Sequence, residues 1–257
     1  MRDTYETIRV DVAGSIVTLT LNRPEKMNAI NSKLSHEAME VLDELTWDEQ
    51  YRVLIITGAG VAFSAGGDYR SGVASSTSSV SSLEFVRHYQ EEVIALLEKV
   101  RLFPRITIAA VNGWALGNGF TLAMLCDYVI AATDARMGIP QIKRGGLPIG
   151  LKSAITFLPH RYALHHLLSG EDITGIEAER LLMINKAVAK DRVLPETYAL
   201  AEKMSEMDPV VVRFLKRAFW REKYLPYTPE TLEIELMANL QVVNIRNAMG
   251  LQGFAEK

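Results

Sequence analysis

The segment formed by residues 111–127, VNGWALGNGFTLAMLCD, carries the clearest chemical signal in the sequence. Gly117 and Gly119 bracket Asn118 and let the backbone turn tightly, and an apolar helix is expected over residues 121–126. The first turn of a helix leaves amide N–H groups unpaired at the positive end of the helix dipole. An oxygen that gains negative charge during a reaction would be stabilised there. The alternative is a glycine turn that only lets a strand and a helix pack closely.

A second glycine loop offers a partner for the first. Residues 53–57 (VLIIT) have the apolar, β-branched composition of a strand buried on both faces, and they lead through a turn into FSAGGD at residues 63–68. Residues 106–111 (ITIAAV) form the corresponding strand before the NGWALGNGF segment. Two strand-to-glycine-loop junctions, each offering a backbone N–H, are what a two-donor oxyanion hole requires.

A third motif, NRPEKMNAI at residues 22–30, precedes the first expected long helix. The order NRPEKMNAI, FSAGGD, NGWALGNGF resembles the crotonase, or enoyl-CoA hydratase/isomerase, superfamily over nearly the whole chain. The resemblance implies an α/β fold, a crotonase-like ββα spiral with a helical C-terminal region that packs the chain into trimers or hexamers. The sequence around Gly119-Phe120-Thr121 and the later DPVVV segment also resembles hydroxycinnamoyl-CoA hydratase-lyases.

The resemblance implies a lyase of the enoyl-CoA hydratase type that acts on an acyl-CoA thioester. Coenzyme A is then part of the substrate, no cofactor is bound permanently, and no metal is expected. The thioester oxygen would lie between the N–H groups of Ala65 and Asn118, where each well-placed donor contributes about 3 kcal/mol to stabilising an enolate. The positions that the resemblance places along coenzyme A and the thioester are Lys26, Met27, Ala29, Ala65, Gly67 and Asp68.

The acids that the family uses are absent from this chain. Hydratases share a water between two glutamates, and the corresponding positions here are Thr121 and Gln141, neither of which can act as a carboxylate base. Isomerases with one glutamate place it in a later turn, where this chain has Ile149. Ordinary hydration and ordinary double-bond isomerisation are therefore both in doubt, although Thr121 and Gln141 can still orient a water by hydrogen bonding.

Other polar residues near the motifs leave several roles open. Asp68 could act as a base or could only hold its loop. Tyr69 and Arg70 could reach an acyl carboxylate or a phosphate, or be solvated loop residues. The serine-rich residues 71–82 have no helical or strand period and predict a surface loop that either closes over an acyl group or has no role. His88 follows this loop, and structural or solvated roles are expected for His36, His160, His165 and His166.

The elements that must position these residues can be read from the hydrophobic pattern. The expected elements are a hairpin of residues 6–12 and 15–21, helices over residues 32–48, 85–100 and 230–247, and the two buried strands. Ser32 is the expected N-cap of the first helix, with Trp47 packing inward, and Thr228 and Pro229 begin the last helix. Residues 1–195 are expected to form the spiral core and residues 196–257 the helical trimerisation region.

Composition narrows the class of protein further. A chain of 257 residues with 48% hydrophobic residues can build one large α/β domain or two small ones. No run of about 18 apolar residues predicts a membrane span, and the start of the chain has no signal-peptide core. The one cysteine, Cys126, is expected in the core, which fits a reducing cytoplasm. A net charge of −3 gives no general attraction to nucleic acid.

Three hypotheses follow from these observations. The first is an acyl-CoA lyase or hydratase-like enzyme with a neutral site, which would suit an enolate made by C–C cleavage or loss of CO₂ and leaves room for a decarboxylase or hydrolase variant. The second is a catalytically silent homologue that binds acyl-CoA. The third, RNA binding, is disfavoured because the chain is slightly acidic and has no basic cluster.

Overall fold

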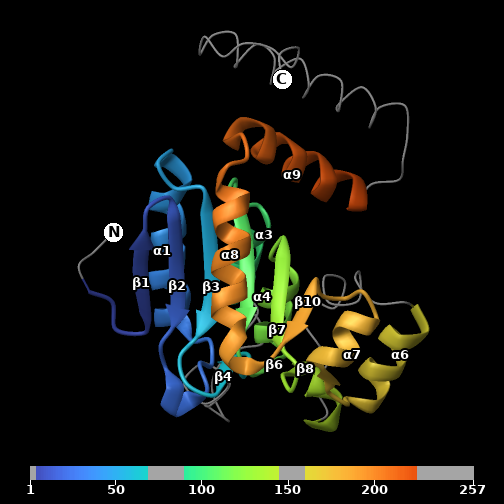
Figure 1. Ribbon diagram of the computed structural model, residues 1–257. Helices are drawn as coiled ribbons and strands as arrows, with labels where there is room; N and C mark the ends of the chain where they lie inside the picture. The colour runs from blue at the N-terminus through green and yellow to red at the C-terminus, as the bar shows by residue number, and fades with distance from the viewer. Residues whose placement is uncertain (1–3, 69–89, 145–159, 225–257) are drawn as a thin grey trace. The chain divides into compact units, whose positions relative to one another are not determined.

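The computed structural model describes residues 4–68, 90–144 and 160–224 (Figure 1). The chain divides into two compact units, Met1–Ser205 and Glu206–Lys257. The predicted division after residue 195 falls inside helix α8 (Val193–Ser205), which belongs to the first unit, and the trimerisation role of residues 196–257 stays a prediction. The predicted features that lie outside the described residues are Tyr69, Arg70, the loop 71–82, His88, Ile149, Thr228, Pro229 and the helix 230–247.

A six-stranded sheet forms the centre of the first unit. Its strands, in spatial order, are β1 (Ile8–Ala13), β2 (Ile16–Leu21), β3 (Val53–Gly58), β5 (Ile106–Val111), β7 (Tyr128–Ala132) and β10 (Lys186–Val188). The first two form the predicted antiparallel hairpin, and every other neighbouring pair is parallel. All residues of β2, β3 and β5 are buried, which confirms the two buried strands read from the sequence.

After each of β3, β5 and β7, the chain adds one short strand to a second, smaller sheet. Its order is β4 (Ala62–Ser64), β6 (Trp114–Leu116), β8 (Arg136–Gly138) and β9 (Ile173–Thr174). The first three are parallel and follow β3, β5 and β7 along the chain, while β9 pairs antiparallel with β8. This repetition is the ββα spiral that the motif order predicted. It brings the carboxyl ends of β4, β6 and β8 to one edge.

Helices cover both faces of the central sheet. In Figure 1, α8 lies in front of the sheet and contacts β2, β3, β5 and β7, while α1 (Ser32–Trp47) and α3 (Ala95–Arg101) lie behind it. The hydroxyls of Tyr198 and Thr18 lie 2.6 Å apart and join α8 to β2. The remaining helical segments are η1 (Pro24–Lys26), η3 (Gln90–Ile94), α4 (Asn118–Met124), η4 (Pro140–Arg144), α6 (His160–Ser169), α7 (Gly175–Arg180) and η5 (Lys190–Arg192).

The second unit contains α9 (Pro209–Tyr224) in its described part. Asp208 caps this helix, because its Oδ1 accepts hydrogen bonds from the N–H groups of Val210 at 2.9 Å and Val211 at 3.2 Å. The DPVVV segment therefore leads into a helix, as its sequence indicated. Among the described residues, no helix is long and apolar enough to cross a membrane.

Two details of the first helix differ from prediction. The N-cap of α1 is Asn31 and not Ser32: Asn31 has an extended backbone, and its Oδ1 accepts the Leu34 N–H at 3.0 Å. Trp47 is 81% exposed instead of packing inward. At about 100° per residue, Trp47 lies on the side of α1 opposite Leu45, the last buried residue of the helix.

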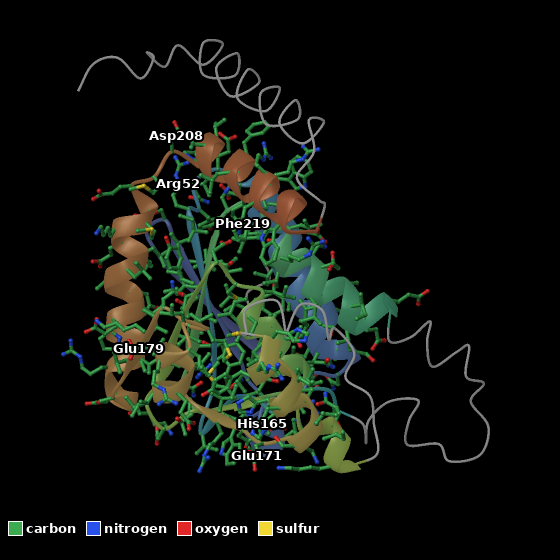
Figure 2. All side chains as sticks on the ribbon, turned by 90° about the vertical axis from the view of Figure 1, so that its right-hand side faces the viewer. Arg52, His165, Glu171, Glu179, Asp208 and Phe219 are labelled. Atoms are coloured by element: carbon green, nitrogen blue, oxygen red, sulfur yellow. The ribbon has the colours of Figure 1, made fainter. Side chains whose placement is uncertain are left out.

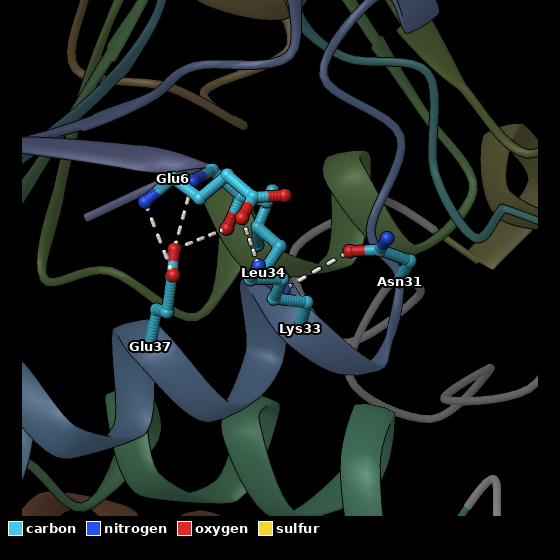
Figure 3. A network of polar contacts seen from close by, with 6 residues as sticks. Glu6, Asn31, Lys33, Leu34 and Glu37 are labelled. Carbon is cyan, nitrogen blue, oxygen red and sulfur yellow. Dashed lines mark hydrogen bonds and ion pairs between the residues drawn. The ribbon is translucent and has the colours of Figure 1, made fainter.

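The N-terminal strand is fixed to α1 by a buried carboxylate (Figure 3). Glu37 Oε2 accepts hydrogen bonds from the N–H of Thr7, at 2.8 Å, and from its hydroxyl, and Oε1 accepts the Glu6 N–H at 3.1 Å. Burial by itself would raise the pKa of Glu37. The hydrogen bonds from Thr7 and Glu6, with the positive charge of Lys33, outweigh burial and lower that pKa below its ordinary value of 4.5.

We expect Glu37→Gln to lower the free energy of unfolding by about 1–3 kcal/mol at pH 7, because an amide cannot satisfy all of these donors. A carboxyl whose folded pKa is lowered stabilises the fold fully above its unfolded pKa, and that contribution is lost as the pH falls through the folded value. The difference between wild type and Glu37→Gln should therefore shrink below about pH 4.5. Urea unfolding from pH 7 to 3 measures it, with the exposed Glu49→Gln as control. A difference that grows on acidification would contradict this account.

Candidate active site

Three loops that follow parallel strands meet at one edge of the small sheet. Residues 65–68 follow β4, Gly117 and α4 follow β6, and η4 follows β8. In α/β folds, ligands bind outside the carboxyl ends of parallel strands, because the following loops converge there. The segments FSAGGD and NGWALGNGF, and the turn with Gln141, therefore converge at one edge, and their function as one site stays a prediction.

The first two loops approach each other so closely that side chains are excluded. A Cβ added to Gly66 would lie 2.6 Å from the Leu116 oxygen and 3.3 Å from the Asn118 nitrogen. A Cβ added to Gly119 would lie 2.4 Å from the Ser64 oxygen. Gly66 also has a φ of +95°, a conformation that L residues rarely adopt. The two glycines thus permit a backbone-to-backbone contact between the loops.

Hydrogen bonds between the first loop and residues 27–30 determine which backbone N–H of the loop can donate to a ligand. The Ala65 N–H donates to the Met27 oxygen at 2.9 Å, which contradicts the prediction that Ala65 supplies the first oxyanion donor. Ile30 bonds with the Gly66 oxygen at 2.7 Å and the Asp68 N–H at 2.8 Å, so both groups face Ile30. Because successive residues of an extended segment alternate in direction, the Gly67 N–H faces the opposite side, and it has no acceptor among the described residues.

The second loop begins α4 earlier than the sequence indicated. The helix spans Asn118–Met124, with Gly117 at the N-cap in a left-handed conformation of φ +53°. Asn118 is the first helical residue and is 1% exposed. The first turn of a helix lies at the positive end of the helix dipole, where an oxygen that gains negative charge is stabilised. The role of Asn118 as the second donor stays a prediction.

Thr121 and Gln141 both lie close to Gly117. The Thr121 hydroxyl is buried and donates to the Gly117 oxygen at 3.2 Å. On the other side, a Cβ added to Gly117 would lie 2.8 Å from Gln141 Nε2. Gln141 Oε1 is buried and has no hydrogen-bond partner among the described residues. A hydroxyl and an amide thus lie beside Gly117, and their correspondence to the two glutamates of hydratases stays a prediction.

Asp68 is held by the NRPEKMNAI segment. Its Oδ2 lies 2.9 Å from Arg23 Nη2, and both side chains are largely buried, with 9% and 13% of their surfaces exposed. Of the two roles left open by the sequence, this ion pair supports the loop-holding one. Lys26 is exposed at the end of η1, and Met27 and Ala29 lie in the segment that borders the FSAGGD loop, so the structure brings the predicted coenzyme A residues together.

The four histidines in the described part of the chain, and the cysteine, lie in structural or exposed positions. His36 is exposed on α1, and His160, His165 and His166 lie on α6. His165 Nε2 lies 3.2 Å from Glu171 Oε2 at the surface (Figure 2). Cys126 is buried, and its thiol donates to the Leu122 oxygen, as expected for a core thiol. No group of three or more His, Cys, Asp or Glu side chains suited to a metal ion occurs in the described part of the chain.

Comparisons with known proteins show which family the chain resembles over its length. Residues 11–257 match the model of the family described as enoyl-CoA hydratase/isomerase. The chain is 32% identical over 255 residues to Probable enoyl-CoA hydratase echA8 of Mycobacterium leprae, covering 98% of this chain and 96% of that protein. It is 32% identical over 237 residues to the hydroxycinnamoyl-CoA hydratase-lyase of Pseudomonas fluorescens, covering 87% and 81%.

Solved structures show the same fold. An enoyl-CoA hydratase subunit I from Geobacillus kaustophilus superposes with a TM-score of 0.84 at 25% identity, covering 98% of each chain. An enoyl-CoA hydratase from Bacillus anthracis superposes with a TM-score of 0.81 at 28% identity, covering 93% of this chain and 90% of that one. The crotonase fold predicted from the three motifs is thereby confirmed.

The contact between the two glycine loops predicts unequal effects of two alanine substitutions. Gly14 has a φ of +61° and open space around its Cα, so Gly14→Ala should cost only the backbone strain of about 1–2 kcal/mol. Gly66→Ala adds a steric clash to comparable strain, and should lower the free energy of unfolding by about 2–5 kcal/mol. Urea unfolding of both variants measures the difference. Equal losses would show that the loops are not in contact.

Proposed function

Because the chain belongs to the enoyl-CoA hydratase/isomerase family, we propose that it is an acyl-CoA enzyme that binds its thioester oxygen between the N–H groups of Gly67 and Asn118. Its chemistry is of the hydratase or lyase type and proceeds without the usual glutamate pair. The observation that carries this proposal is the contact of the two glycine loops, which sets the outward-facing Gly67 N–H beside the start of α4.

The two amides would stabilise charge that develops on the thioester oxygen. Backbone donors fixed in place before the reaction need no reorganisation, and each is worth about 2.7–4 kcal/mol in comparable holes. Such a hole favours any reaction that passes through an enolate. The neutral groups of Thr121 and Gln141 then decide which bonds of the enolate can form or break.

A hydroxyl and an amide cannot remove an α-proton as a carboxylate does. Gln141 Oε1 is a buried acceptor without a partner among the described residues, so it can receive a hydrogen bond from a substrate hydroxyl or a water. Loss of CO₂ gives an enolate without any base, whereas C–C cleavage of a β-hydroxyacyl thioester also releases the hydroxyl proton, which would pass to water because neither Thr121 nor Gln141 can take it. The relative named as a hydratase-lyase supports C–C cleavage as the reaction type.

The remaining features of the proposal concern the ligand and the assembly. Exposed Lys26 can neutralise a phosphate of coenzyme A, beside Met27 and Ala29. Coenzyme A would enter only as part of the substrate. We also propose a cytoplasmic homo-oligomer, a trimer or hexamer packed through residues 196–257. A catalytically silent acyl-CoA-binding protein is the second candidate, favoured by the absence of carboxylates from the Thr121 and Gln141 positions.

A gain-of-function experiment tests the assignment of Thr121 and Gln141. The wild type should hydrate crotonyl-CoA at least about 100-fold more slowly than the double variant Thr121→Glu, Gln141→Glu, since general acid–base groups typically contribute 10²–10⁴-fold. Loss of absorbance from the conjugated enoyl thioester reports the rate. The single variant Thr121→Gln is the control, because glutamine has the bulk of glutamate without its charge and Gln141 is already present.

Rapid hydration by the wild type would show that the paired carboxylates are not needed, and would overturn the neutral-site proposal. If the wild type binds acyl-CoA while neither it nor the glutamate variant turns over any acyl group, the silent candidate is favoured.

A further inference from the structure

The loop that carries Gly67 is tied down on both sides of this residue. Before it, the Ala65 N–H donates to the Met27 oxygen, and the Gly66 oxygen accepts the Ile30 N–H. After it, the Asp68 N–H donates to the Ile30 oxygen. Residues 27–30, a turn that ends in an isolated bridge between Ile30 and Gly67, therefore hold the loop in place. Gly67 has little freedom to rotate its N–H, because its neighbours on either side are held by these bonds.

Asn28 fixes this turn to the segment that runs from β3 to the start of β4. The residue is fully buried and adopts a left-handed φ of +54°. Its Nδ2 donates to the oxygens of Ala59 at 2.9 Å and Ala62 at 2.7 Å, and its Oδ1 accepts the Arg23 N–H at 2.9 Å. One side chain thus joins the beginning of NRPEKMNAI to the strand that precedes the glycine loop.

The side chain of Ser64 links Asn28 to the glycine loop. The Ser64 hydroxyl donates to the Asn28 carbonyl oxygen at 2.8 Å and accepts the Gly66 N–H at 3.2 Å. The carbonyl and the side chain of Asn28 are therefore both used in holding the loop. An aspartate or alanine at position 28 would lose the two bonds that Nδ2 donates.

The ion pair of Arg23 with Asp68 adds a further link between residues 22–30 and the glycine loop. Arg23 Nη1 donates to the Ala29 oxygen at 2.6 Å, while Nη2 lies 2.9 Å from Asp68 Oδ2. The guanidinium consequently links Ala29 with Asp68, the residue that directly follows Gly67. Its planar, rigid set of donors can serve two acceptors in fixed geometry.

We propose that Arg23, Asn28 and Asp68 form a brace that orients the Gly67 N–H toward the thioester oxygen, with Asp68 acting as a positioning residue and not as a base. This inference rests on the proposed function, because the Gly67 N–H matters only if it binds the thioester. The brace supplies orientation in advance of substrate binding, which is the condition for a backbone donor to stabilise developing charge efficiently.

The experiment measures the hydrogen bonds to the thioester carbonyl directly. Butyryl-CoA labelled with ¹³C at the carbonyl is bound to the full-length protein, and the shift of its carbonyl stretch is read by isotope-edited infrared spectroscopy. The affinity for butyryl-CoA is compared with that for the thioether S-butyl-CoA, which lacks the carbonyl oxygen. The wild type should lower the carbonyl frequency and bind the thioester at least about tenfold more tightly than the thioether.

Asp68→Asn should remove at least about half of the frequency shift and reduce the preference for the thioester by about tenfold, since the Gly67 N–H loses its fixed direction. Glu37→Gln is the matched control, because it removes a buried carboxylate of another network and should leave both readouts unchanged. Arg23→Met combined with Asp68→Leu removes the ion pair without leaving a buried charge unpaired, so it should fold and still lose the shift.

The outcomes separate the two proposals. If the wild type shows neither the shift nor the preference for the thioester, the proposed function fails. If the wild type shows both, and either the Asp68→Asn variant or the double variant retains both in full, the brace is overturned while the oxyanion hole stands.

Discussion

The close approach of two backbone segments, residues 64–67 after β4 and residues 116–119 after β6, is the constraint on which the site depends. Gly66 and Gly119 permit it, because a Cβ on either would lie under 3 Å from a backbone oxygen of the other segment. Parallel pairing of β4 with β6 brings both segments to one edge. The spiral of the chain, the buried strands of the large sheet and the helices on its faces hold the two strand ends at this separation.

Main-chain and side-chain groups have different proposed roles at this edge of the small sheet. The proposed donors are backbone N–H groups, which survive substitution of the surrounding side chains and are oriented by the network of Arg23, Asn28 and Asp68. The side chains proposed to choose the reaction, Thr121 and Gln141, are neutral. Under this proposal, the binding of the thioester oxygen and the fate of the enolate depend on different parts of the site.

The sequence predicted more of the fold than of the site. The apolar patterns of residues 6–12 and 15–21 predicted the hairpin, and the buried β-branched runs predicted β3 and β5, because strands buried on both faces consist almost wholly of apolar residues. Ala65 was the wrong choice of donor, since the occupancy of its N–H depends on Met27, which is 38 residues away in sequence and adjacent only in the fold. The pairing of Arg23 with Asp68 was missed for the same reason. Trp47 could have been placed correctly from the helical period of α1 alone.

A crystal structure of the protein with butyryl-CoA tests the central claim most directly. The account predicts that the thioester oxygen lies about 3 Å from both the Gly67 nitrogen and the Asn118 nitrogen, within the range of a backbone hydrogen bond. The Ala65 N–H should remain bonded to the Met27 oxygen, as it is in the structure described above. A thioester oxygen more than about 3.5 Å from both nitrogens, or one bound by Ala65 instead, would contradict the account.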